Sequence, residues 1–335
     1  MEVKTGHKPF FSVVMPAYNA ESYISRAIGS VISQSFTDWE LIVVDDGSTD
    51  STLDIAKQHS ITDRRIKVEK LPYNSGSAYQ PRKTAFEISS GSYLIWLDTD
   101  DFIENAYLDK IYRRICDTGA DVIYGKMVYQ DKNQLPDSKF DTQKIYHGKE
   151  AVKFTLDVWQ IGANGCALAS ELVRNVYLKY DSSVTEMNAD EIMTRQLLIN
   201  ADKLAFANAI YYYGDNTDSI TRHVSIKAFD RIKTGQQLRE LIKLNYTTNS
   251  IERVLIEKQL AKELISLIFL YSKHQKYFSK QGKSILDSLN NCWNSLEWKH
   301  LKNNLPAKYF FLLQLGPKNI IRLKSVYDAI RRGQK

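Results

Sequence analysis

The chain has 335 residues, of which 43% are hydrophobic and 25% charged, a composition typical of a globular protein that can bury a full core. It contains no apolar run of 18 residues, so a membrane-spanning helix is not expected, and residues 1–9 show no apolar signal segment. The three cysteines are widely spaced, so neither a disulfide framework nor a zinc site is expected. Together these features favour the cytoplasm. The net charge of +6 is uneven, since residues 225–335 contain 21 Lys and Arg against 8 Asp and Glu, whereas residues 1–224 contain 24 against 31. The acidic N-terminal part suits cation binding, and the basic C-terminal part suits an anionic partner.

The first 130 residues alternate short apolar runs with segments of helical periodicity, which predicts an α/β fold with a largely parallel sheet. Buried strands are expected at Phe10–Met15, Trp39–Val44, Ile66–Val68 and Tyr93–Leu97. Helices are expected over residues 23–32, through Ile55 and Ala56, and between Gly76 and Ser90, with Gly91 as the C-cap of the last.

Polar or acidic clusters follow three of these strands, at Pro16–Asn19, Asp45–Asp50 and Asp98–Asp101. In an open α/β sheet, ligands bind outside the carboxyl ends of the strands. The sequence therefore predicts that these three segments converge on one ligand site.

Beyond Gln130 the pattern is less regular, with a polar loop at Asp131–Asp141 and a helix at Asn188–Ala201. From Ser225 onward it is almost wholly helical, including Ile251–Tyr271. We expect an α/β domain over residues 1–224 and a basic helical region over residues 225–335.

The carboxylates of the clusters indicate specific chemistry. Asp98 and Asp100 present the oxygen ligands that Mg²⁺ and Mn²⁺ prefer, although acidic turns are also common without a metal. Asp45 and Asp46 are placed where a carboxylate can accept a hydrogen bond from a base imide or a ribose hydroxyl. Gly47 permits a tight turn, and Asp50 or Ser51 can cap the following helix.

Four motifs in this order, PAYN at residues 16–19, VDDGSTD at 44–50, NSG at 74–76 with Arg82, and DTDD at 98–101, resemble the nucleotide-binding signature of the family 2 glycosyltransferases. The resemblance covers about residues 10–130 and 180–222. It implies the GT-A fold, a nucleoside-diphosphate-sugar donor with UDP as the first expectation, and inverting transfer to a hydroxyl. The implied acceptor is a glycan or lipid-linked glycan of a cell-surface polysaccharide.

The resemblance also implies roles for individual residues. Residues 10–130 would form the donor half and residues 131–224 the acceptor and catalytic half, including Trp159 and Tyr177. The nucleoside would be held by Pro16, Ala17, Tyr18, Asp45 and Asp46, and the donor site would also be lined by Asn74, Gly76 and Arg82. Asp98 and Asp100, the latter more directly, would bind the diphosphate through Mn²⁺ or Mg²⁺, with His223 as a further candidate ligand. Lys83 departs from the family, which has Asn after the arginine.

Alignment on Thr194-Arg195 places Asp190 at the family's general base, with Ala189 where the family has Glu. Glu191 is the alternative base, and Asp190 also suits the N-terminal end of a helix without any catalytic role.

Aromatic and basic residues interleave at Lys308–Leu313 and Ile320–Lys324, followed by Arg331 and Arg332. This pattern is typical of a helix on an anionic membrane surface, here the inner face of the plasma membrane, and equally of a packed helix with a basic outer face. No nucleic-acid module is recognised, so nucleic acid is not an expected partner.

The sequence offers little support for two other enzyme classes or for a non-catalytic role. A nucleotidyltransferase would need a Gly-rich basic loop near the N-terminus, which residues 16–22 lack, and a dinucleotide-dependent enzyme would need GxGxxG after the first strand. A binding protein or scaffold would tolerate loss of the acidic clusters, which are present except at the Ala189 position.

Overall fold

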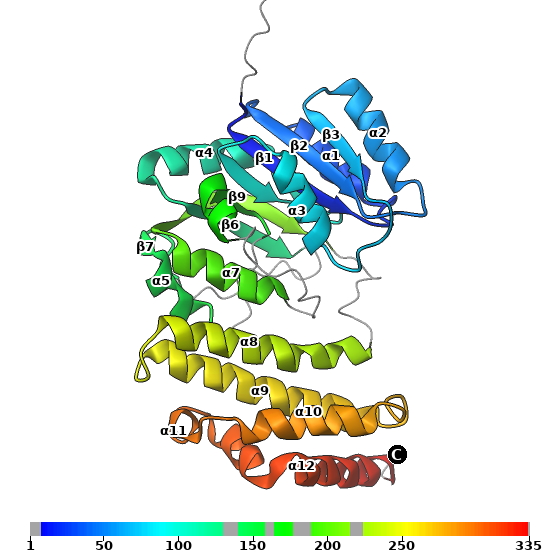
Figure 1. The fold of residues 1–335 in the computed structure, drawn as a ribbon, viewed down its shortest axis with the longest axis vertical. Coiled ribbons are helices and arrows are strands. Elements are labelled where there is room, and N and C mark those ends of the chain that lie inside the picture. Colours follow the sequence, from blue (N-terminus) through cyan, green and yellow to red (C-terminus); the bar gives the residue numbers. More distant parts are fainter. Residues whose placement is uncertain (1–7, 130–139, 158–163, 177–188, 215–223, 334–335) are drawn as a thin grey trace, which may run out of the picture. The chain divides into compact units, whose positions relative to one another are not determined.

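The computed structural model describes residues 8–129, 140–157, 164–176, 189–214 and 224–333 (Figure 1). Contacts along the chain define two compact units. The first comprises Met1–Ala151, Gln160–Thr185 and Met193–Ser219, and the second comprises Val152–Trp159, Glu186–Ile192 and Ile220–Lys335.

The first unit contains a mixed, mostly parallel sheet. The strands of its parallel part are β1 (Phe11–Ala17), β2 (Trp39–Asp45), β3 (Ile66–Lys70) and β4 (Tyr93–Trp96). The other strands are β5 (Phe102–Ile103), β6 (Val122–Tyr129), β7 (Tyr146–His147), β8 (Cys166–Ala169) and β9 (Lys203–Tyr213). The order is β3-β2-β1-β4-β8-β6-β9-β5, with β7 also pairing with β9. β8 runs antiparallel to β4 and β6, and β6 is parallel to β9. The predicted α/β class is confirmed.

Helices cover this sheet, as Figure 1 shows. They are α1 (Ile24–Ile32), α2 (Thr52–Thr62), α3 (Tyr79–Ile88), α4 (Tyr107–Thr118), α5 (Gly148–Ala151) and α6 (Ser170–Val176). α1 forms because Ile24, Ala27, Ile28 and Val31 recur on one helical face, and that face is buried. α2 begins at Thr52 with Ser51 as its N-cap residue, and Asp50 Oδ1 accepts the N–H of Thr52 at 3.0 Å.

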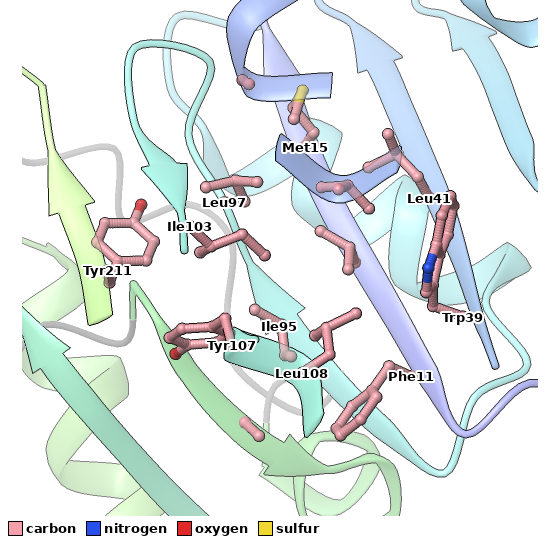
Figure 2. Packing of buried hydrophobic residues seen from close by; sticks show 14 of the residues in the cluster. Phe11, Met15, Trp39, Leu41, Ile95, Leu97, Ile103, Tyr107, Leu108 and Tyr211 are labelled. Carbon is pink, nitrogen blue, oxygen red and sulfur yellow. The ribbon is translucent and has the colours of Figure 1, made fainter. Parts of the chain in front are cut away.

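The core between the sheet and its helices joins residues from distant parts of the chain. Figure 2 shows Phe11, Met15 and Leu41 of β1 and β2 with Leu108 of α4 in the same cluster, and all four are fully buried. Full burial of an aliphatic or aromatic side chain contributes about 1.5–3 kcal/mol. This packing fixes the directions of β1, β2 and β4, and hence the edge where their carboxyl ends lie.

At the opposite ends of these strands lies a polar cluster around the buried Glu40, which the sequence did not indicate. Glu40 of β2 accepts hydrogen bonds from the hydroxyl of Ser12 at 2.6 Å, from the Ser90 N–H at 2.7 Å and from Lys67 Nζ at 2.7 Å. Burial by itself raises the pKa of Glu40, but these bonds together hold that pKa below its ordinary value.

The expectation that Gly91 caps the third helix was wrong. α3 ends at Ile88 with Ser89 as its C-cap, and Gly91 lies against Ser12 of β1, to whose Oγ its N–H donates at 2.9 Å. A Cβ on Gly91 would stand 2.6 Å from the backbone nitrogen of Ser12, so glycine is required here by close approach.

The second unit is helical, as residues 225–335 predicted. It contains η1 (Val152–Phe154), the first turn of α7 (Ala189–Asn200), η4 (Ile226–Phe229), α8 (Asp230–Asn245), α9 (Ile251–Lys273), α10 (Gly282–Asn294), α11 (Trp298–Leu301) and α12 (Ala307–Gly333). The long α9 lies at the centre of its core, which includes Leu260, Leu264 and Ile268. None of the described helices combines the length and apolar character needed to cross a membrane.

α12 carries the predicted aromatic and basic segment. Gly316, with φ 76°, and Pro317 interrupt its helical geometry, which gives the helix a kink. Leu313 and Ile320 are buried in the core of the unit, whereas Phe311 is 60% exposed. The segment is therefore partly packed and partly open to solvent.

Candidate active site

The segments after β1 and β2 are held together by hydrogen bonds, as their predicted convergence requires. Asn19 adopts a positive φ of 45°, and its Oδ1 accepts the N–H of Thr49 at 2.9 Å. The N–H of Asn19 donates to Ser48 Oγ at 3.0 Å, and the N–H of Ala20 donates to Thr52 Oγ1 at 2.6 Å. These bonds hold Pro16–Asn19 against the turn that follows β2, and Tyr18 in this segment is 48% exposed.

Asp45 lies at the carboxyl end of β2 and is fully buried. Its Oδ2 accepts the N–H of Ser48 at 3.2 Å. Its Oδ1 is also buried and has no hydrogen-bond partner within the part of the chain that the structure describes. Leaving a buried carboxylate oxygen without a hydrogen bond costs more than about 1–3 kcal/mol of free energy, so a ligand N–H that donates to this atom would be strongly favoured.

Asp46 serves a different purpose from Asp45. Its two carboxylate oxygens accept from Ser75, one from the N–H at 3.0 Å and the other from the hydroxyl at 2.9 Å. Asn74 Oδ1 in turn accepts the N–H of Gly76, which has φ 82°. A Cβ on Gly47 would stand 2.8 Å from the nitrogen of Asn74. Asp46 and Gly47 therefore hold the NSG turn in place.

The carboxylate of Asp98 is held from both sides. Arg82 Nη2 donates to its Oδ1 at 2.7 Å, and Asn164 Nδ2 donates to its Oδ2 at 2.6 Å. The Arg82 guanidinium also lies over the Trp96 ring, with its Cζ 5.3 Å from the ring centroid. Sequence reasoning missed Asn164, because it lies 66 residues beyond Asp98 in a region without a recognisable motif.

Asp100 and Asp101 differ in exposure. Asp100 is half-buried, and its backbone oxygen accepts from Arg26 Nη2 at 2.7 Å. Asp101 is fully buried and accepts from the Tyr211 hydroxyl and from the Gly214 N–H. Burial, followed by the charges of the two neighbouring aspartates, raises the pKa of Asp101 well above its ordinary value. Asp101 thus ties the end of β9 to the acidic turn.

The residues present fit a divalent ion that is shared with a diphosphate. The described residues include no group of three or more His, Cys, Asp or Glu side chains placed to hold a metal alone. Mg²⁺ commonly takes only one or two protein carboxylates and completes its shell with water and substrate phosphates. Asp98 and Asp100 are both partly exposed, and each oxygen of Asp98 accepts one hydrogen bond, which leaves a second lone pair on each for a metal.

The two candidate bases differ in their surroundings. Both lie in the first turn of α7, which belongs to the second unit. Asp190 is exposed, whereas Glu191 is 8% exposed and accepts from Gln259 Nε2 at 2.9 Å. Trp159, Tyr177 and His223 lie outside the described residues.

Residues 12–173 match the family model described as "Glycosyl transferase family 2". This part of the chain belongs to glycosyltransferase family 2. The match contains all four motifs between residues 16 and 101, and the alternating strands and helices that it covers are those described above.

Curated relatives of the chain include two bacterial proteins. Poly(ribitol-phosphate) beta-N-acetylglucosaminyltransferase TarS of Staphylococcus aureus is 27% identical over 268 residues, which are 78% of this chain and 45% of that protein. The putative teichuronic acid biosynthesis glycosyltransferase TuaG of Bacillus subtilis is 45% identical over 106 residues, 32% of this chain and 42% of the relative. The chain spans less than half of the length of both relatives.

Among solved structures, residues 1–349 of S. aureus TarS in complex with UDP-GlcNAc are similar, with a TM-score of 0.70 and 20% identity over 98% of this chain and 92% of that one. A mannosyltransferase of Pyrobaculum calidifontis in complex with GDP-Man and Mn²⁺ has a TM-score of 0.55 at 13% identity, over 96% of this chain and 88% of that one. The likeness to TarS confirms the expected GT-A fold with its helical C-terminal region.

Proposed function

We propose that this protein is an inverting glycosyltransferase that transfers a sugar from a UDP-sugar to a hydroxyl of a cell-surface glycan or lipid-linked glycan. Family membership supports glycosyl transfer, and the buried Oδ1 of Asp45 is the observation that carries the choice of nucleotide. The imide N–H of uracil can donate a hydrogen bond to that oxygen, and burial strengthens such a bond. The solved complex of TarS with UDP-GlcNAc supports the same donor class.

The other donor-side residues have distinct proposed roles. Tyr18, which is partly exposed next to Asp45, would pack on the base, and the NSG turn that Asp46 holds would line the ribose and phosphates. Asp100 would hold Mg²⁺ or Mn²⁺, which when bound would neutralise charge on the leaving diphosphate. Arg82 and Asn164 would keep Asp98 oriented toward the same ligand.

Asp190 would act as the general base. The acceptor oxygen bonds to the anomeric carbon while the bond from that carbon to the donor phosphate oxygen breaks, and UDP leaves with the bonding electrons. The acceptor proton passes to the carboxylate of Asp190. Since attack comes from the face opposite the leaving group, an α-linked donor gives a β-linked product. The exposure of Asp190 supports this choice over Glu191, whose carboxylate is buried and bonded to Gln259.

The proposed acceptor class and location rest on further observations. TarS is named as a poly(ribitol-phosphate) β-N-acetylglucosaminyltransferase and TuaG for teichuronic acid biosynthesis, which supports a cell-wall polymer as acceptor. The basic residues of α12 and its exposed Phe311 support peripheral association with the anionic inner face of the plasma membrane.

The test is a donor panel read by thermal stabilisation and by nucleotide release. UDP should raise the melting temperature in Mg²⁺ or Mn²⁺, because a ligand that binds only the native state stabilises it. Asp100→Ala should abolish most of the metal-dependent shift. Equal stabilisation by UDP in EDTA would contradict the metal bridge, and a wild-type protein that responds to no nucleoside diphosphate would contradict the proposed function.

A further inference from the structure

Gln259 of α9 connects two segments that are far apart in the sequence. Its Nε2 donates to Glu191 Oε2 at 2.9 Å, and its Oε1 accepts the N–H of Asp157 at 3.0 Å. A backbone N–H can only donate, so Oε1 must face Asp157 and the NH₂ group must face the carboxylate. The orientation of this amide is therefore determined by its partners, and all three residues belong to the second unit.

Asp157 is itself held firmly. It adopts φ 60°, which is uncommon for a residue other than glycine, and its carboxylate is bound by Lys262 at 2.6 Å and by Lys258 at 3.4 Å. Lys258, Gln259 and Lys262 share one face of α9, so a single helix face fixes the end of the segment that begins with η1.

Glu191 uses this anchored amide to fix the start of α7. The first turn of a helix has fewer internal hydrogen bonds than the rest of the helix, so a side-chain contact with a neighbouring element restrains it. Glu191 is buried and bonded to Gln259, while its neighbour Asp190 is exposed. Because the two residues are adjacent, holding Glu191 restrains the backbone that carries the Asp190 side chain.

We propose that Gln259 is a positioning residue for glycosyl transfer, acting through Glu191 to hold the Asp190 carboxylate in place. This inference rests on the proposed function, in which Asp190 is the base. Since catalytic geometry is sensitive to displacements of about 1 Å, loosening this turn should lower kcat. The donor KM should not change, because the proposed donor residues lie in the first unit.

Gln259→Glu sets a carboxylate against Glu191 without changing side-chain length. We expect kcat for UDP release from UDP-N-acetylglucosamine with poly(ribitol phosphate) to fall roughly 10- to 100-fold, with the donor KM within about twofold of wild type. Adding Glu191→Gln should restore kcat to within about threefold, because an amide at position 191 can donate to the new carboxylate, which still accepts from Asp157. Gln236→Met on α8 is the control and should leave both constants unchanged.

Hydrogen exchange tests the same contact without relying on activity. Peptides covering residues 152–157 and 189–196 should exchange faster in Gln259→Glu and return to wild-type rates in the double variant, with peptides of β1 and β2 unchanged. Wild-type exchange in Gln259→Glu, or no rescue by Glu191→Gln, overturns the inference. Faster exchange that is rescued, together with full turnover by Asp190→Asn, would instead keep the structural contact and refute Asp190 as base in the proposed function.

Discussion

Replacing Asp45 by asparagine tests how the protein selects its nucleotide. In the wild type, Oδ2 of Asp45 accepts the N–H of Ser48, and the buried Oδ1 would accept the uracil N3–H. An asparagine has one oxygen and one NH₂ group, so one of these two N–H donors must face another donor. The substitution therefore keeps the size of the side chain and removes one hydrogen bond at either position.

The expected magnitude follows from the burial of the group. A hydrogen bond to a charged group contributes about 1.5–3 kcal/mol, and Asp45 is fully buried, so solvent screening is small. This corresponds to a loss of roughly 10- to 150-fold in affinity at 25 °C. Isothermal titration calorimetry with UDP in Mg²⁺ measures it, and the exposed Asp54→Asn on α2 is the control with the same chemical change.

Cytidine diphosphate supplies the second arm of the test. Cytosine carries an acceptor at N3 in place of the imide N–H, so the wild type should bind CDP more weakly than UDP by a similar factor. Asp45→Asn should lose most of that discrimination. Unchanged UDP affinity in Asp45→Asn, or equal affinity of the wild type for UDP and CDP, would refute the assignment of Oδ1 to the base.

Three further predictions concern the base, the buried polar cluster and the membrane. Asp190→Asn should lower the transfer rate by at least about 100-fold while donor binding is retained, whereas Glu191→Gln should have a smaller effect. If Glu191→Gln has the larger effect in the same assay, the base is Glu191. Because the pKa of Glu40 is lower in the folded protein, its ionisation stabilises the fold above the unfolded pKa of about 4.5, and this contribution is lost as pH falls through the folded pKa. Chemical denaturation from pH 7 to 3 should thus show a steeper loss in the wild type than in Glu40→Gln, and parallel curves would argue against it. Phe311→Ser should weaken sedimentation with anionic vesicles while Ile61→Ser, which removes an exposed apolar side chain elsewhere, does not; equal sedimentation of both variants would favour the packed-helix interpretation.

Much of the fold around the proposed donor site was predictable from sequence because its signals are local. A β-branched run followed by Pro-Ala-Tyr-Asn or Asp-Asp-Gly-Ser specifies both a strand and the polar turn after it. Parallel pairing of β1 with β2 and β4 then brings those turns to one edge. The helical character of residues 225–335 was equally visible, since it depends on apolar spacing within each segment.

What the sequence could not show was the partner of each polar side chain. Asp45 and Asp46 are adjacent and chemically identical. Yet Asp45 has a buried oxygen without a hydrogen-bond donor among the described residues, whereas both oxygens of Asp46 hold the NSG turn. Gly91 looked like a helix cap, and only its approach to Ser12 reveals why a side chain is excluded there.

By itself the sequence determined the strands, the acidic turns that follow them and the family to which they belong, because each depends on residues within one short segment. The tertiary structure decided the contacts of Asn164 with Asp98 and of Gln259 with Glu191, which join positions 66 and 68 residues apart. Such contacts depend on how strands and helices pack. Packing is driven by apolar burial, which is non-directional, so the apolar pattern of the sequence does not reveal which polar groups will come within hydrogen-bonding distance.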